Sequence, residues 1–138
     1  MEDAAHAARY EFFARAAAAW HADVVALGHT RDDQAETFLL RLLRGAGARG
    51  LASMYPRAGI VIRPLLDSAR ADVQAFLDHH GIPSLHDESN DDVAIPRNRI
   101  RAELLPLLKQ KFNPGVVDAL ASSAQLARMD EAYLQAAA

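Results

Sequence analysis

Two short apolar runs restrict the fold of this chain more than any other feature, because they are the clear strand signals in its 138 residues. Residues 23–28 (DVVALG) and residues 60–62 (IVI) are each closed by a nearby glycine or proline, which predicts two buried strands. Helical patterns precede, separate and follow them, so the order predicts an α/β fold with a parallel sheet and flanking helices. Two strands are few for such a sheet, since covered parallel strands need neighbours on both sides.

Helical patterns fill most of the N-terminal half outside the two strands. Residues 3–20 are rich in helix-forming residues, with an apolar stripe that includes Tyr10 and Phe13. Residues 32–44 are clearly amphipathic, and the positions expected to face the core are Ala35, Phe38, Leu39, Leu42 and Leu43. The glycine-rich stretch 45–50 is expected to end this helix.

The C-terminal half is predicted to consist mainly of helices. Ser68 is placed to cap a helix that stops before Gly81. The polar and acidic stretch 84–93 is expected to form a loop. Pro96 suits the first turn of a further helix, which Pro106 is expected to kink or end.

Composition excludes several classes of protein. The chain has no cysteine, which rules out disulfides, thiolate catalysis and cysteine-based metal sites. A hydrophobic fraction of 51% with 24% charged residues is typical of a globular domain. The apolar runs are too short to span a membrane, and the N-terminus is acidic where signal peptides are basic, so we expect a cytoplasmic protein without membrane contact.

Arginine dominates the basic residues, although the net charge is −3. Thirteen of the fifteen basic residues are arginine, and two clusters stand out, Arg41–Arg44–Arg49 and Arg97–Arg99–Arg101. The planar guanidinium group is well suited to phosphate and carboxylate. A biased codon supply, also visible in the many alanines, explains the same composition without any function.

Acidic residues cluster where the first predicted strand passes into a helix, in the segment Gly28-His29-Thr30-Arg31-Asp32-Asp33-Gln34-Ala35-Glu36. The carboxyl ends of parallel strands are where open α/β sheets bind ligands. Asp33 and Glu36 share a helix face, and with Asp32 they could hold a magnesium–phosphate group or a ligand ammonium. Acidic residues in a first helical turn also simply complement the helix dipole, and this alternative stays open.

A second group of polar residues lies further along the chain. Asp87-Glu88-Ser89-Asn90 precede the basic segment Arg97-Asn98-Arg99-Ile100-Arg101. Arg97 and Arg101 are four residues apart and lie near a predicted helix N-terminus, which suits an anion such as a phosphate. A solvated charged helix paired with the acidic loop is the alternative.

Taken in order, these segments resemble the tRNA(Ile)-lysidine synthetase family of PP-loop ATP pyrophosphatases. The resemblance covers most of the chain up to about residue 113, and several short motifs occur in family order with similar spacing. They are Ala7–Tyr10, Gly28–Thr30, Asp32–Thr37, Leu39–Gly45, Gly50–Leu51, Arg63–Leu66, Asp87, Ser89–Asn90, Arg97–Arg101 and Leu104–Pro106. The resemblance implies a partial PP-loop fold, similar to adenine nucleotide alpha hydrolases, with a parallel sheet and a helix-rich C-terminal half.

The resemblance implies an ATP-dependent carbon–nitrogen ligase. In this family ATP adenylates the wobble cytidine of an isoleucine tRNA with a CAU anticodon, and free lysine then displaces AMP. By charge and position, the residues expected to carry catalysis are Asp33, Glu36 and Arg101, with Asp33 also the candidate Mg²⁺ ligand. Those expected to bind substrate or nucleotide are Arg9, His29, Asp32, Arg97 and Asn98. A homodimer is compatible with the resemblance.

The chain departs from the family pattern at two places. The glycine-rich Ser-Gly-Gly-x-Asp-Ser loop that grips pyrophosphate does not occur in the sequence, and His6 stands where the family usually has arginine. We therefore expect residues 1–112 to be the distal part of the catalytic domain, and residues 113–138, opening with Asn113-Pro114, to be a helical linker. The related tRNA-thiolating enzymes share the Gly-His-x-x-Asp-Asp segment but generally use cysteines, which this chain does not have.

Two other functions remain open at the level of sequence. A non-catalytic RNA-binding or interaction module would keep the Arg97–Arg101 face and bind RNA in a salt-dependent way. An inert remnant would expose a sheet edge and aggregate. Because the pyrophosphate-binding loop does not occur in these residues, we expect the isolated chain to be inactive.

Overall fold

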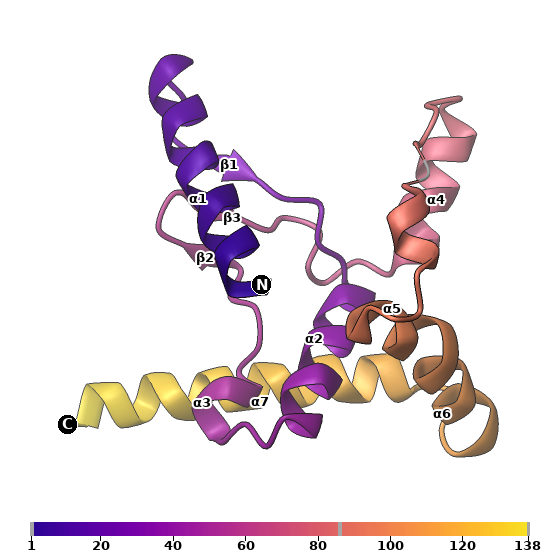
Figure 1. The fold of residues 1–138 in the computed structure, drawn as a ribbon. Coiled ribbons are helices and arrows are strands. Elements are labelled where there is room, and N and C mark those ends of the chain that lie inside the picture. The colour runs from indigo at the N-terminus through magenta and orange to yellow at the C-terminus, as the bar shows by residue number, and fades with distance from the viewer. Residues whose placement is uncertain (1, 86, 138) are drawn as a thin grey trace.

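A computed structural model describes the backbone of residues 2–85 and 87–137 and the side chains of residues 7–85 and 87–137. Short strands and longer helices alternate along the chain (Figure 1). The α-helices are α1 (Glu2–Ala19), α2 (Arg31–Leu43), α3 (Ala48–Leu51), α4 (Arg70–His79), α5 (Pro96–Arg99), α6 (Leu105–Lys111) and α7 (Val116–Ala137). The strands are β1 (Val25–Ala26), β2 (Arg57–Ala58) and β3 (Val61–Ile62), and a 3₁₀ turn (Glu88–Asp91) and a π-helical turn (Ile100–Leu104) complete the fold.

The molecule has a helical base from which two arms rise. In Figure 1, α7 runs along the base and α2 stands on it, with α3 and α6 at its two sides. One arm carries α1 and the small sheet, and the other carries α4. None of the helices in the described ranges combines the length and the hydropathy of a membrane span.

The sheet is small and mixed. β3 lies between the other two strands, parallel to β1 and antiparallel to β2. The parallel pairing of the two predicted strands is therefore confirmed, whereas β2 was not predicted. The prediction that the first strand is buried is wrong, because β1 lies at the edge of the sheet, where Val24 is 38% exposed and Ala26 is exposed.

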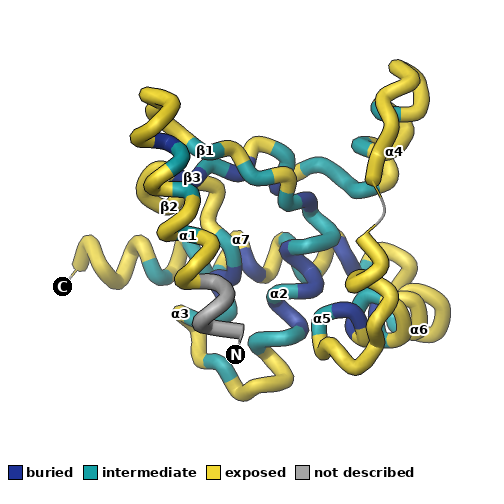
Figure 2. The backbone as a smooth tube through the Cα atoms, turned by 45° about the horizontal axis from the view of Figure 1, so that its top comes forward, coloured by how far each residue is buried: buried dark blue, intermediate teal, exposed yellow. Residues whose placement is uncertain are grey.

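The hydrophobic core lies between the base helices and not under the sheet, as the buried positions in Figure 2 show. It is formed by Ala35, Leu39, Ile100, Leu105 and Val117. Ala35 and Leu39 come from the predicted apolar face of α2, and Phe38 is buried as well. The expectation that this face continues to residues 42 and 43 is wrong, because the last turn of α2 leads directly into a mostly exposed turn.

The start of α4 differs from its predicted cap. Ala69, not Ser68, is the residue before the helix, and its side chain cannot accept a hydrogen bond. The carboxylate of Asp32 takes this role from another helix, since its Oδ2 accepts the backbone N–H of Arg70 at 2.8 Å. α4 is thereby tied to the beginning of α2.

The helical path from Pro96 to Lys111 is widened but not broken. Pro96 is in the first turn of α5, as predicted. The π-helical turn precedes Pro106, which lies in the first turn of α6. Proline cannot donate the usual backbone hydrogen bond, and the widened turn accommodates this loss. Pro106 therefore neither ends the helical path nor breaks it, and the expected kink or end is replaced by a π-helical turn.

α7 begins at Val116 and not at Asn113-Pro114, where the helical segment is predicted to open, and it packs along the base. The side chain of Asn113 accepts the N–H of Gly115 at 2.9 Å, just before the helix. Val117 and Ala124 are buried against the rest of the base. The division into a domain of residues 1–112 and a linker of residues 113–138 stays a prediction.

Two leucines on α2 test the position of the core. Leu39→Ala removes a side chain that is 6% exposed, so we expect it to lower the free energy of unfolding by about 2–5 kcal/mol. Leu43→Ala is the matched control, with 68% exposure and an expected effect of about 0.5 kcal/mol. Urea unfolding measures both, and equal effects would contradict this core.

Candidate functional site

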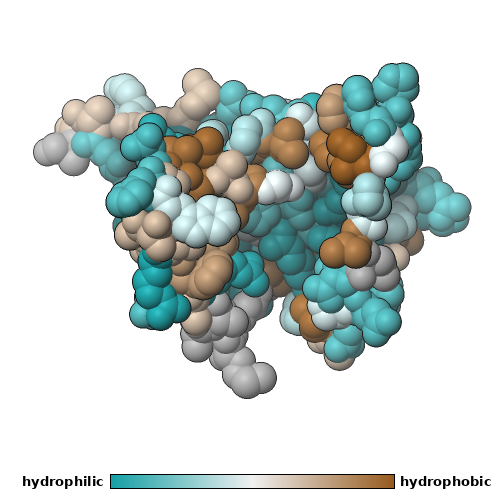
Figure 3. Space-filling view, turned by 90° about the horizontal axis from the view of Figure 1, so that it is seen from above, coloured by the Kyte–Doolittle hydropathy of each residue, from teal (hydrophilic) through white to brown (hydrophobic). Residues whose placement is uncertain are grey.

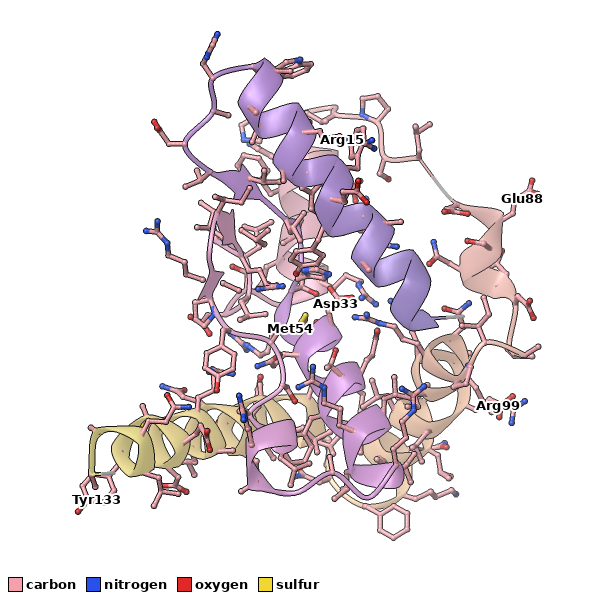
Figure 4. All side chains as sticks on the ribbon, turned by 60° about the vertical axis from the view of Figure 1, so that its left-hand side comes forward. Arg15, Asp33, Met54, Glu88, Arg99 and Tyr133 are labelled. Carbon is pink, nitrogen blue, oxygen red and sulfur yellow. The ribbon has the colours of Figure 1, made fainter. Side chains whose placement is uncertain are left out.

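Two carboxylates of α2 meet three arginines from later parts of the chain. Asp33 and Glu36 lie on the first turns of α2 and face Arg70 of α4, Arg97 of α5 and Arg101 of the π-helical turn. Figure 4 shows Asp33 near the centre of the molecule, whereas Arg99 and Glu88 lie at its periphery. Helical spacing places the two acidic side chains on one face, but only the tertiary fold brings the arginines to them. We call these five residues the arginine–carboxylate cluster.

Glu36 is the centre of the cluster, with a side chain that is 0% exposed. Arg101 binds it with two nitrogens, Nε to Oε1 at 2.7 Å and Nη2 to Oε2 at 2.9 Å. Arg97 donates from Nε to Oε2 at 3.0 Å, and Arg70 makes longer contacts of 3.3 and 3.4 Å to Oε1. The hydrogen bond to Glu36 is the largest cause of a raised pKa of Arg101, and the charges of Glu36 and Asp33 raise it further against the opposing effect of burial.

Asp33 uses both of its oxygens. Oδ2 accepts the backbone N–H and the hydroxyl of Thr30, each at 2.8 Å, and Oδ1 faces Arg70 at 2.9 Å and Arg97 at 3.3 Å. Burial alone would raise the pKa of Asp33. The hydrogen bonds from Thr30 and the arginine charges outweigh burial and lower the pKa below its usual value.

The cluster carries one more positive charge than negative charge. Three guanidiniums surround two carboxylates, and Arg70, Arg97 and Arg101 remain 39%, 31% and 30% exposed. Removing one partner from such a buried group is costly because it leaves an uncompensated charge. The carboxylates therefore fix the positions of the arginines, whose exposed parts are available to an anion.

A cationic groove of about 500 Å³ borders the cluster. Arg97 and His29 line it, together with residues of α1, α2 and the segment around β2. Among the residues whose side chains the structure describes, the lining contains five arginines and no carboxylate, the arginines being Arg9, Arg41, Arg44, Arg63 and Arg97. Figure 3 shows a hydrophilic hollow between the two arms. Such a surface attracts polyanions.

His29 is held neutral on the wall of the groove. Its Nδ1 accepts a hydrogen bond from Arg63 Nε at 3.3 Å, and Arg63 also donates to the hydroxyl of Tyr10 at 2.8 Å. Burial lowers the pKa of His29 below its ordinary value, and the charges of Arg63, Arg97 and Arg9 lower it further against the opposing effect of Asp33. A neutral imidazole can contact a nucleotide by hydrogen bonding, without adding charge.

The predicted site residues line the groove, belong to the arginine–carboxylate cluster, or bind the backbone. Arg9, His29 and Arg97 line the groove, and Asp33, Glu36, Arg97 and Arg101 form the cluster. Asp32 caps α4, and the amide of Asn98 donates to Ser89 O at 2.8 Å and Asp92 O at 3.0 Å, so both hold the backbone together. The side chain of His6 lies outside the described residues.

Sequence reasoning missed Arg70. It follows β3 by eight residues and opens α4, and no periodic pattern marks it as part of a site. The order of the strands could have indicated Arg70, because β3 is parallel to β1 and the segments that follow both strands leave the sheet at the same edge. Arg63 directly follows β3 and joins the groove for the same reason, whereas Arg41 and Arg44 reach it from the C-terminal end of α2.

The cluster does not fit a resident magnesium ion. Magnesium requires carboxylate oxygens that are free to coordinate it, whereas both oxygens of Asp33 and both of Glu36 already accept hydrogen bonds. Among the described residues, no group of three or more histidine and acidic side chains is arranged to hold a metal.

Comparison with known proteins identifies the family. The model of the PP-loop domain family (ATP_bind_3) matches residues 1–108. The chain belongs to the PP-loop domain family. Members of this family use ATP, and the cationic groove lies next to the strand–helix junction at Gly28–Arg31.

Curated relatives of this PP-loop chain are named tRNA(Ile)-lysidine synthase. The protein of Geobacter sulfurreducens is 51% identical over 136 residues, covering 97% of this chain and 29% of the relative. That of Solibacter usitatus is 46% identical, covering 96% of this chain and 30% of the relative. That of Thermobifida fusca is 47% identical, covering 98% and 42%. The chain thus spans less than half the length of these relatives.

The lowered pKa of Asp33 predicts a specific loss of stability in acid. An unfolded aspartate titrates at about 3.9, so the contribution of Asp33 is complete above that pH and disappears as the pH falls through the lower folded value. We expect the free energy of unfolding to fall as the pH drops below about 4, and this fall to be shallower in Asp33→Asn. Asp130→Asn, exposed on α7, should keep the wild-type dependence; equal slopes in all three proteins would contradict the assignment.

Proposed function

We propose that this chain forms part of the active site of a tRNA(Ile)-lysidine synthase, an ATP-dependent ligase that joins lysine to the wobble cytidine of an isoleucine tRNA. One observation carries the proposal: in a PP-loop domain, a groove whose described lining contains five arginines and no carboxylate adjoins the arginine–carboxylate cluster. The names of the relatives support the reaction and its substrates. The reaction would take place in the cytoplasm.

The proposed reaction has two displacements, both of which release an anion. The cytidine O2 attacks the α-phosphorus of ATP and expels pyrophosphate, and the lysine ε-amine then attacks C2 and expels AMP with loss of a proton. Fixed cations stabilise the charge that develops on the leaving groups. Arg97 and Arg101 are held for this role by Glu36, and Arg9 lies across the groove.

Recognition of lysine would use the same two carboxylates. In the free chain their oxygens are occupied by guanidiniums, so an ammonium has to replace one of them. We expect Arg70 to yield, because its contacts to Glu36 are the longest of the three arginines and its side chain is the most exposed. Magnesium would then be coordinated by the phosphates of ATP and not by a side chain of this chain.

A chimera tests the proposed function. This chain would replace the matching 136 residues of the Geobacter sulfurreducens relative, and labelled lysine incorporation into a tRNA with a CAU anticodon would be measured. We expect ATP-dependent incorporation. In the same chimera, Glu36→Gln should lower the rate about 100-fold because the arginines lose their anchor, a cost typical of small misplacements.

The control for Glu36→Gln is Glu103→Gln, which makes the same change at an exposed position one turn from the cluster and should leave the rate unchanged. Thermal unfolding shows whether each variant is folded. A folded chimera without lysine incorporation would contradict the proposal. If the 138-residue chain still binds tRNA in that case, the non-catalytic RNA-binding function takes its place.

A further inference from the structure

A short buried segment forms one wall of the groove in an unfavourable backbone conformation. Ser53, Met54 and Tyr55 line the groove, and Ser53 is 4% exposed with φ of +56°. This left-handed region favours glycine, and other residues adopt it only where their surroundings hold them there. Side chains from α2 and α7 bind the backbone of this segment.

Two arginines bind four carbonyl groups between Gly50 and Met54. Arg41 of α2 donates from Nη1 to Gly50 O at 2.8 Å and to Ser53 O at 3.2 Å. Arg128 of α7 donates from Nη1 to Ala52 O at 3.2 Å and to Met54 O at 3.1 Å. Arg128 therefore joins the carbonyls on either side of the left-handed Ser53. Arg41 joins the carbonyl of Ser53 itself to that of Gly50.

Gln34 completes the arrangement. Its amide donates to Met54 O at 3.0 Å and accepts the Met54 N–H at 3.0 Å. Arg63 then binds the next carbonyl, Tyr55 O, at 2.7 Å. Arg128 differs from the other three side chains because it comes from the C-terminal helix. Like Gln34, it lines a separate cavity between α2 and α7 and not the groove.

We infer that Arg128 is a positioning residue, through which α7 sets the shape of the groove by holding the left-handed turn at Ser53. Without its two hydrogen bonds, Ser53 relaxes to a negative φ and moves Met54 and Tyr55, which changes the distance from this wall to Arg9 and Arg97. What the groove binds rests on the proposed function. The control of the groove's shape by α7 rests only on the hydrogen bonds of Arg128 to Ala52 O and Met54 O.

Salt-dependent RNA binding tests this inference on the 138-residue chain. The probe is a fluorescein-labelled RNA hairpin with a CAU loop, and its Kd is measured by anisotropy over a range of salt concentrations. We expect Arg128→Gln to weaken binding about tenfold with no change in the slope of log K against log[salt], because Arg128 touches no phosphate. Arg9→Gln should reduce the slope by about 0.7–0.9, since one phosphate contact is lost.

Two further variants separate positioning from general damage. Arg49→Gln removes an arginine that is 85% exposed and lies 3.8 Å from Glu131 of α7, so this variant should bind like wild type. Ser53→Gly introduces the residue that adopts positive φ without strain. In the Arg128→Gln background it should restore affinity to within about threefold of wild type, because the turn no longer needs to be held.

A slope reduced by Arg128→Gln, wild-type affinity in that variant, or no rescue by Ser53→Gly would each overturn the inference. If the wild-type chain binds no RNA, the proposed function fails but the control by α7 is still tested. Backbone amide exchange over residues 52–55 should then be faster in Arg128→Gln than in Arg49→Gln, and equal rates would refute it.

Discussion

The carboxylate of Glu36 is completely buried, and an ionised group in that position costs several kcal/mol unless cations and hydrogen bonds compensate it. Arg97 and Arg101 supply this compensation from a segment more than sixty residues away, and Arg70 adds to it from α4. The C-terminal half of the chain is thereby fixed against the start of α2. Breaking the cluster would leave either a buried carboxylate or three crowded guanidiniums, so the fold and the site depend on the same contacts.

α2 contributes to the hydrophobic core with one face and to the arginine–carboxylate cluster with another. One face buries Ala35 and Leu39 against α7 and the helices that follow Pro96, and another presents Asp33 and Glu36 to the arginines. Because a helix is rigid over thirteen residues, packing on one face sets the geometry on the other. The helical base therefore determines where the cationic groups lie, while the three two-residue strands contribute little buried area.

Hydrogen bonding to backbone carbonyls is the second recurring device. Arg41, Arg63 and Arg128 each bind carbonyls of the segment from Gly50 to Tyr55, which helps to satisfy the hydrogen-bonding needs of its partly buried backbone. Arginine is suited to this because its planar group has several donors in fixed directions. The abundance of arginine in this chain thus serves backbone geometry as well as the charge of the groove.

The sequence by itself determined the helices, the parallel pairing of the two strands, and the placement of Asp33 and Glu36 on one face, because local periodicity and residue propensities decide these features. It also supplied motifs sufficient to recognise the family. Tertiary structure alone decided that the carboxylates bind arginines, that Arg70 is one of these arginines, and that the Asn98 amide binds backbone carbonyls. Such partners are distant in the chain, and long-range electrostatic compensation and hydrogen bonding leave no periodic signal in the residues that take part.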